Sequence, residues 1–285
     1  MIGLGEVLWD LLPSGRVLGG APANFAYMAS VLGDEGIVAS RIGTDDLGCE
    51  ALDAMQRLGL NASFVQRDDL HATGTAEVSI DGGGQRTFSI KERVAWDFLQ
   101  WTAEWEELSA RADVVCCGSL AQRSPTSALT IERFLRNTRK GALRVCDVNL
   151  RQSYYSHDVL WKCFEYANVA KLNEQELPQV SSVLKLGIGS EEVLANRLLR
   201  KCNLRLVCIT RGARGSVLVS DEKIVEHEGF RVKVVDAIGA GDAFTASLAH
   251  HYTRGLSLEE ISENANRFAS WVTTQRGATP AVGAE

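Results

Sequence analysis

The amino-acid sequence predicts an α/β protein with a mostly parallel central sheet sandwiched between layers of helices. Over most of the 285 residues, apolar runs of strand length alternate with segments in which apolar residues recur at helical spacing. One part departs from this pattern, because residues 72–98 contain an alternating β-hairpin. Together with residues from about 11–19, this hairpin predicts a small β-lid on one domain that spans 1–285, since no repeat or linker divides the chain.

The composition limits the ligands that this protein can bind. Hydrophobic residues make up 45% of the chain and charged residues 23%, as in a globular protein with a sizeable core. The net charge of −6 argues against nucleic acid or an anionic membrane as the main partner. Because the sequence shows neither a basic leader nor an apolar run of membrane-spanning length, we expect a cytoplasmic protein that binds small molecules.

Polar residues near the N-terminus are candidate ligand contacts. A strand is expected over residues 2–8, and Asp10 follows it, where open α/β sheets place their ligands; a turn-forming aspartate is the alternative. Gly19 and Gly20 precede a helix, so the backbone can approach a bound molecule closely. Asn24 offers a donor and an acceptor to neutral hydroxyls, unless it only caps that helix.

The predicted hairpin comes after a further strand and helix. A strand is expected at 36–40, followed by a helix that ends at about residue 58. Residues 75–80 then alternate between polar and apolar, the glycines at 82–84 form a turn, and 87–90 are strand-like again. A lid of this kind can exclude water from a transfer reaction.

From residue 101 onward, strands and helices alternate again. Strands are expected at 114–118, 143–148, 169–172, 204–209 and 216–219, and helices at 127–138, at 159–166, after a Ser190 cap, and at 258–273. After one of these strands, Asn173 and Glu176 offer oxygen ligands suited to Mg²⁺, although Asn173 could simply cap a helix. After another, Thr210, Gly212 and Gly215 could cradle a nucleotide or form an ordinary β-turn.

A glycine-rich turn near the C-terminal end predicts an anion site. The β-branched run 232–235 leads as a strand-like segment into Gly239, Ala240 and Gly241, and a helix starts at once. Small residues at a helix start let backbone amides converge on an anion, and the helix dipole adds positive charge there. Asp242 lies beside this anion, which suggests that it handles a proton or a hydroxyl during phosphoryl transfer. The alternative is an ordinary tight turn in which the dipole favours an aspartate.

Other phosphate-binding and metal-binding motifs are absent from the sequence. No GxxxxGK[ST] sequence occurs, so this is not a P-loop protein. Residues 239–244 resemble a truncated dinucleotide fingerprint, but Phe244 stands where that motif needs Gly or Ala for close helix packing. The 5 histidines show no ligand spacing, which argues against a metal site built on His or Cys.

Together, these motifs resemble the ribokinase/PfkB family of carbohydrate kinases over essentially the whole chain. The two signature regions of the family correspond to residues 19–24 and 236–242, its N-x-x-E element to 173–176, and its T-x-G-x-x-G element to 210–215. The stretches 5–10, 118–123 and 147–152 are similar to the fructokinase branch. The resemblance implies a ribokinase-like three-layer α/β/α fold and an ATP- and Mg²⁺-dependent sugar kinase, with fructose as the expected acceptor.

The resemblance also implies roles for individual residues. Asp242 is the expected catalytic base, and the amides of Gly239, Ala240 and Gly241 form the expected anion hole. The expected sugar contacts are Asp10, Gly20, Asn24 and Arg151. The expected nucleotide contacts are Asn173, Glu176, Thr210, Gly212, Gly215 and the helix around Asn266, and Asn173 and Glu176 would also organise Mg²⁺, largely through water.

The resemblance leaves several points open. Ala237 stands where many members have Thr, although Ala also occurs in fructokinase-like sequences. Some relatives bind a monovalent cation near the loops at Asp236 and 277–280, which makes K⁺ a candidate cofactor, and relatives often dimerise through their lids, which makes 72–90 a candidate homodimer surface. The acceptor could instead be ribose, 2-keto-3-deoxygluconate or adenosine. A catalytically silent sugar-binding regulator is the remaining alternative, against which the intact Asp242 argues.

Overall fold

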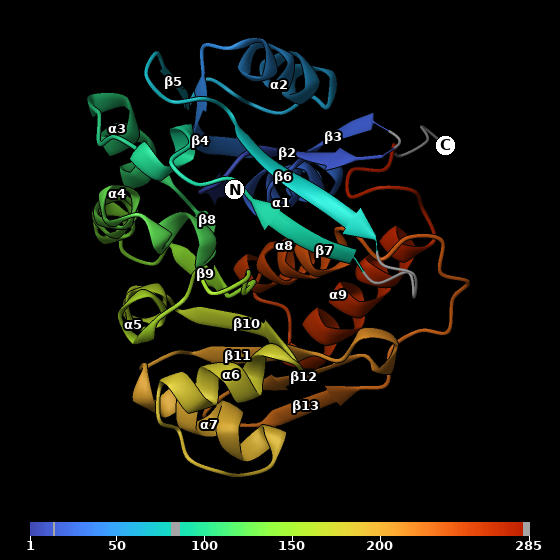
Figure 1. The fold of residues 1–285 in the computed structure, drawn as a ribbon. Coiled ribbons are helices and arrows are strands. Elements are labelled where there is room, and N and C mark those ends of the chain that lie inside the picture. Colours follow the sequence, from blue (N-terminus) through green and yellow to red (C-terminus); the bar gives the residue numbers. More distant parts are fainter. Residues whose placement is uncertain (14, 81–85, 282–285) are drawn as a thin grey trace.

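The computed structural model describes residues 1–13, 15–80 and 86–281, and its main sheet is mostly parallel (Figure 1). The spatial order of the strands is β13 (Ile224–His227), β12 (Ser216–Val219), β11 (Leu206–Thr210), β10 (Val169–Asn173), β9 (Leu143–Asp147), β8 (Val114–Cys117), β1 (Ile2–Leu4), β4 (Ile37–Gly43) and β5 (Val65–Asp68). From β11 to β5 all neighbouring strands are parallel, whereas β12 and β13 pair antiparallel at one edge.

Helices cover both faces of this sheet. One apolar core lies between the sheet and α1 (Ala21–Val31), α2 (Asp46–Arg57), α8 (Ala240–Thr253) and α9 (Leu258–Thr273). The other face is covered by α3 (Ala103–Arg111), α4 (Pro125–Asn137), α5 (His157–Glu165), α6 (Glu176–Val183) and α7 (Glu191–Lys201). Short 3₁₀ turns at Ala95–Phe98, Leu120–Arg123 and Gly212–Arg214 connect these elements.

Strand β8 shows why two helical layers form. Val114 and Cys116 pack into the core that contains α8 and α9, whereas Val115 and Cys117 pack into the core that contains α3 and α4. Because successive side chains of a strand point to opposite faces, a strand that is apolar at every position needs cover on both sides. The predicted three-layer α/β/α fold with its parallel sheet is thus confirmed.

A second, smaller sheet forms the lid (Figure 1). Its order is β3 (Gly15–Gly19), β2 (Leu8–Leu12), β6 (Gly74–Ile80) and β7 (Arg86–Ile90). Strands β6 and β7 form the predicted antiparallel hairpin, and the predicted glycine turn at 82–84 lies outside the described residues. A parallel pairing of β2 with β6 joins the two halves of the lid, which come from distant parts of the sequence.

Two local predictions are wrong. The single strand expected over 2–8 ends at Leu4, and Leu8 already begins lid strand β2. Ile2 and Leu4 are buried in the main sheet and Leu8 is buried in the lid sheet, so the hydrophobicity of these residues gives no sign of the break. The run 232–235 forms no strand either, because the amide of Val235 donates to the carbonyl of Thr273 at 2.8 Å instead of pairing with a sheet.

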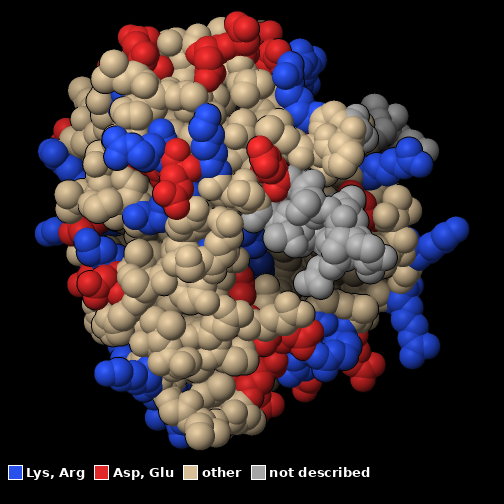
Figure 2. All heavy atoms as spheres, viewed as in Figure 1, with Lys and Arg blue, Asp and Glu red and all other residues tan. Residues whose placement is uncertain are grey.

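On the face shown in Figure 2, basic and acidic side chains are interspersed over the molecule. Within the described part of the chain, no helix combines the length and the apolar character that crossing a bilayer requires.

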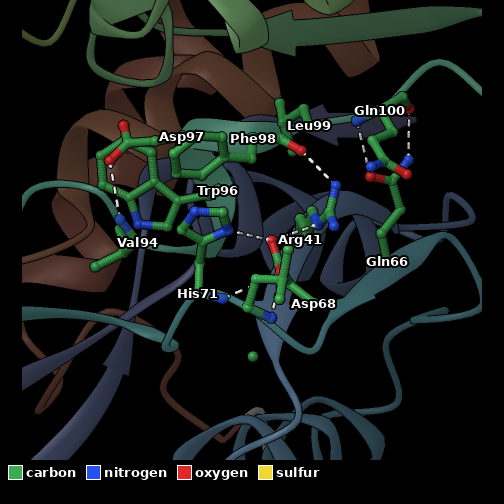
Figure 3. Close-up of polar contacts among 12 residues, drawn as sticks. Arg41, Gln66, Asp68, His71, Val94, Trp96, Asp97, Phe98, Leu99 and Gln100 are labelled. Carbon is green, nitrogen blue, oxygen red and sulfur yellow. Dashed lines mark hydrogen bonds and ion pairs between the residues drawn. The ribbon is translucent and has the colours of Figure 1, made fainter.

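A buried ionic cluster fixes the segment between β5 and lid strand β6 (Figure 3). Asp68, only 1% exposed, lies 2.9 Å from Nε of Arg41 and 3.0 Å from Nδ1 of His71. Its Oδ1 atom also accepts the amides of Leu70 and His71, and the His71 ring stacks on Phe98. Desolvation alone would raise the pKa of Asp68, but these hydrogen bonds and Arg41 together hold it below its usual value.

We expect the Asp68→Ala substitution to lower the free energy of unfolding by about 3–5 kcal/mol, because it leaves the buried Arg41 without its carboxylate. Chemical denaturation monitored by circular dichroism measures this loss. The exposed neighbour Asp69 provides the matched control, and Asp69→Ala should leave the midpoint unchanged. Equal midpoints for the two variants would contradict a structural role for the cluster.

Candidate active site

The turn that the sequence predicts as an anion site lies at the start of helix α8. Gly239 has φ of +80°, and a Cβ atom there would lie only 2.7 Å from Cα of Ala278, so glycine is required. The Ala240 amide makes only a 3.4 Å bond to Ala237, and, within the described residues, the amides of Gly239 and Gly241 donate to no backbone carbonyl. Unpaired amides at a helix start, aided by the helix dipole, are the usual receptors of a phosphate.

The other signature region, residues 19–24, contacts this turn directly. Nδ2 of Asn24 donates to Oδ2 of Asp242 at 2.8 Å, across a sequence separation of 218 residues. Asn24 makes no side-chain cap for α1, so the helix-cap alternative does not describe it. Gly20 has φ of +110°, and a Cβ atom there would lie 2.5 Å from the carbonyl oxygen of Glu6. Only glycine therefore lets the start of α1 come this close to the segment that follows β1. The structure therefore unites an expected sugar contact with the expected base.

The surroundings of Asp242 raise the pKa of its carboxyl group toward neutral pH. Its residue is only partly buried, so a substrate can reach it. Desolvation raises the pKa of Asp242 to about 6, and the nearby carboxylate of Asp147 adds to the rise. The Asn24 hydrogen bond and the positive charges of Lys171 and Arg151 oppose it.

Sequence reasoning missed a buried cluster beside this turn. Lys171 and Asp147 are register partners in β10 and β9, and Nζ of Lys171 lies 3.1 and 3.2 Å from the two carboxylate oxygens of Asp147. The hydroxyl of Thr245, in α8, donates to Oδ2 of Asp147 at 2.7 Å. The sequence does carry a signal for this cluster, because a lysine and an aspartate each lie within an apolar run. Charged side chains are almost never buried without a partner, so the two could have been expected to pair.

Glu6 was also not assigned a role, although it lies near the same site. Its side chain is 3% exposed, and among the residues that the structure describes its Oε2 atom has no hydrogen-bond partner. Desolvation raises the pKa of Glu6 to about 7, with Arg151 opposing the rise and Asp242 adding to it. Arg151 itself is half-buried and bonds to the carbonyl of Leu150.

Asp10 lies at a different place from the one that the sequence predicted. It belongs to lid strand β2, opposite Val17 of β3 and Ala76 of β6, and not to the carboxyl end of a main-sheet strand. Its Oδ2 atom comes close to Gly19, where a Cβ atom would lie 2.5 Å from it. Asp10 therefore faces the chain segment that enters α1.

Asn173 and Glu176 form a reciprocal pair at the start of α6. Oδ1 of Asn173 accepts the amide of Glu176 at 2.9 Å, and Oε2 of Glu176 accepts the amide of Asn173 at 2.8 Å. The helix-capping alternative for Asn173 is thus observed. Oε1 of Glu176 accepts the amide of Leu150, desolvation raises the Glu176 pKa, and Lys171 opposes the rise.

These two residues suit a hydrated metal ion better than a directly bound one. Their oxygens already accept amide protons, but carboxylate and amide oxygens keep lone pairs that can accept hydrogen bonds from metal-bound water. In the part of the chain that the structure describes, no three His, Cys, Asp or Glu residues gather as a metal site.

The expected nucleotide contacts fall into two places. Thr210 is the register partner of Asn173, which sets the two motifs side by side at the ends of β11 and β10. Gly212 is exposed with open space around its Cα atom, whereas Gly215 is buried and packs against His227. Asn266 is 5% exposed in α9, and its amide donates to the Ser216 and Ser262 oxygens inside the core.

The cavities at the two ends of the main sheet differ in volume. A cavity of about 10 Å³, room for a single water-sized group, touches Asp242 and Asp147. A larger one of about 720 Å³ lies beside Met1 and Val114, at the amino ends of β1 and β8. Because parallel α/β sheets bind ligands beyond the carboxyl ends of their strands, we assign the site to the end that carries Asp242.

Comparison with known proteins identifies the family of this chain. Residues 15–283 match the family described as pfkB family carbohydrate kinase. The chain is 30% identical to the fructokinase of Salmonella typhimurium, with 98% of this chain and 94% of that protein covered. The fructokinase of Xylella fastidiosa with bound ATP has a TM-score of 0.84 at 23% identity, over 98% of this chain and 93% of that one.

A further solved structure is a fructokinase double mutant of Vibrio cholerae bound to fructose, ADP and potassium ion. Its TM-score is 0.79 at 24% identity, and the alignment covers 97% of this chain and 92% of that one. These structures share the fold, and the family match extends over nearly the whole sequence. The chain belongs to the pfkB family of carbohydrate kinases.

Proposed function

We propose that this protein is a fructokinase that transfers the γ-phosphoryl group of ATP to a hydroxyl of fructose. The observation that carries the proposal is the contact between Asn24 and Asp242, which places a group suited to sugar hydroxyls beside a carboxylate at an anion-binding helix start. The near-complete alignment with a relative named fructokinase supports fructose as the acceptor.

In this proposal, each part of the site has one task. Asn24 orients the sugar hydroxyl, Asp242 accepts its proton, and the amides of Gly239 to Gly241 stabilise the charge on the transferring group. A loose phosphoryl-transfer transition state needs positioning and charge stabilisation more than a strong base, so a carboxylate suffices. The sugar oxygen attacks phosphorus in line as the bond to the ADP oxygen breaks.

The remaining residues hold the nucleotide and its metal. Asn173, Glu176, Thr210 and Gly212 form the proposed phosphate and ATP contacts at the ends of β10 and β11. Mg²⁺, held through water by Asn173 and Glu176, would neutralise phosphate charge when bound. For Gly215 and Asn266, which are buried, we propose that they shape this end of the site.

Two further features of the resemblance stay as proposals. Asp236 Oδ2 accepts the amide of Gly277 at 3.3 Å, so the two loops expected to bind K⁺ are adjacent. The lid sheet ends in edge strand β3, where Val17 is 45% exposed. An edge strand with an exposed apolar side chain can pair with another chain, which makes the lid the proposed homodimer surface.

Measurement of ADP release with a panel of acceptors tests the proposed function. Fructose should give the highest kcat/KM among fructose, ribose, 2-keto-3-deoxygluconate and adenosine. A higher value with another member of the panel would reassign the acceptor. Sugar binding without ADP release would instead indicate a regulator.

We expect the Asp10→Asn substitution to raise the KM for the sugar by about 10-fold or more while the KM for ATP changes little, because a carboxylate-to-hydroxyl hydrogen bond of about 1.5–3 kcal/mol is lost. Steady-state kinetics with each substrate varied in turn measures the two constants. Glu77→Gln, an exposed change on neighbouring strand β6, should alter neither. Equal increases in both KM values would contradict a sugar contact.

The pH dependence of kcat/KM for the sugar should show an acid limb with an apparent pKa of about 6, set by Asp242. Only the ionised carboxylate accepts a proton, so activity is full above this pH and falls as the pH drops through it. Initial rates at saturating ATP and Mg²⁺ measure the limb. The residual activity of an Asp242→Asn variant should lack it, and a limb that persists there would assign the titration to another group.

A further inference from the structure

The buried cluster of Lys171, Asp147 and Thr245 touches the anion-binding turn itself. A Cβ atom added to Gly241 would lie 2.9 Å from Nζ of Lys171, so the ammonium group packs against the backbone of the turn. The Thr245 hydroxyl bridges the same region, because it lies 2.7 Å from Oδ2 of Asp147 and 3.0 Å from the carbonyl oxygen of Gly241. Helix α8 is thereby tied to β9 and β10 at a residue whose amide is proposed to meet the transferring phosphoryl group.

Stability alone does not account for this pair. Lys171 and Asp147 are 6% and 4% exposed, and the desolvation of such an ion pair usually offsets most of its Coulombic attraction. Replacing a buried ion pair by apolar side chains of similar volume is often neutral or stabilising in proteins. A buried lysine at this position therefore points to a function of its charge.

The charge of Lys171 acts on the base as well as on the turn. The polar groups that face Asp242 are Glu6 after β1, Asn24 of α1, Cys116 of β8, Asp147 of β9, Arg151 after β9, and Lys171 of β10. Asp147 disfavours the ionised form of Asp242, and Lys171 favours it. Because Lys171 is hydrogen-bonded to Asp147, it also offsets the charge of this competing carboxylate.

We propose that Lys171 is a positioning residue for phosphoryl transfer, which holds Gly241 and Asp242 in place through Asp147 and Thr245 and balances the charge of Asp147 beside the base. This inference rests on the proposed function and adds to it a group that the sequence did not single out. Because Lys171 acts through the turn and through Asp242, its removal should change kcat and the pH dependence of kcat/KM.

The Lys171→Met substitution keeps the length of the side chain and removes its charge. We expect kcat to fall about 10- to 100-fold, with the sugar KM nearly unchanged, because transition-state stabilisation at the turn is lost. The acid limb of kcat/KM should move to higher pH, because Asp147 then acts on Asp242 without compensation. Lys223→Met is the matched control, since Lys223 forms an ion pair with Glu259 at the surface.

Two further variants separate positioning from charge and guard against poor folding of Lys171→Met. Asp147→Asn removes the competing carboxylate and should move the acid limb to lower pH, opposite to Lys171→Met. Thr245→Val removes only the hydroxyl and leaves both charges, so kcat should fall while the limb stays in place. Circular dichroism and thermal unfolding establish which variants are folded.

The outcomes distinguish this inference from the proposed function. Wild-type ADP release with the acceptor panel decides the function first, and the variants are then compared with whichever acceptor is turned over. Opposite limb shifts in Lys171→Met and Asp147→Asn support the inference. Folded variants with wild-type kcat, or with lower thermal stability and unmoved limbs, would show that the pair is only structural and would overturn it.

Discussion

The Asp242→Asn substitution should lower kcat by about 100- to 10,000-fold, the range that a general base usually contributes. Asparagine has the same shape, and its carbonyl oxygen can still accept the hydrogen bond from Asn24 that Asp242 Oδ2 accepts now. The loss would therefore come from the missing basic oxygen and not from a rearranged turn. Release of ADP in a coupled assay measures kcat, and isothermal titration calorimetry measures ATP binding, which should be unchanged.

Stability gives a second check on this substitution. The pKa of Asp242 is raised to about 6 by desolvation and by Asp147, so its ionisation at neutral pH opposes folding. A neutral asparagine removes this cost, and the unfolding temperature should be no lower than that of the wild type. Asp221→Asn, in the exposed turn after β12, is the control and should change neither property. Near-wild-type kcat in Asp242→Asn would remove the base assignment.

The sequence allowed the parts of this site to be predicted where local rules determine them. Gly239 and Gly20 adopt backbone conformations that other residues avoid, and Ser190 caps α7 by accepting the amide of Val193 as expected. Helix α9 has the predicted bounds, because its apolar periodicity is uninterrupted. The backbone conformation of a glycine, a helix cap and an apolar periodicity are all set by residues close in sequence.

Features that depend on distant neighbours could not be predicted in the same way. The contact between Asn24 and Asp242 joins residues 218 positions apart, and the family resemblance implied only that both residues belong to the same site. The pairing of Lys171 with Asp147 depends on the register of β10 against β9, which apolar strands do not reveal. The position of Asp10 in the lid required knowing that the chain leaves the main sheet after Leu4.

The Gly239→Ala substitution should lower kcat about 100- to 1,000-fold, comparable to the loss of one anion-hole donor. The φ of +80° disfavours any side chain, and the added Cβ would come within 2.7–2.9 Å of Ala278 on the neighbouring loop. The turn must therefore shift, and the Gly241 amide moves with it. Because the sugar contacts of α1 are untouched, kcat should fall far more than the sugar KM rises.

Gly255 provides the control for this change, because it lies at the other end of α8 with a similar φ of +74° and open space around it. Both Gly255→Ala and Gly239→Ala should lose about 1 kcal/mol of stability to the left-handed conformation alone. Only Gly239→Ala should lose turnover. Steady-state kinetics measures the turnover of both variants, and thermal unfolding measures their stability. If the two variants lost activity equally, backbone strain in α8 would explain the effect and the anion hole would not. A selective loss assigns the chemistry to the three amides at the start of α8.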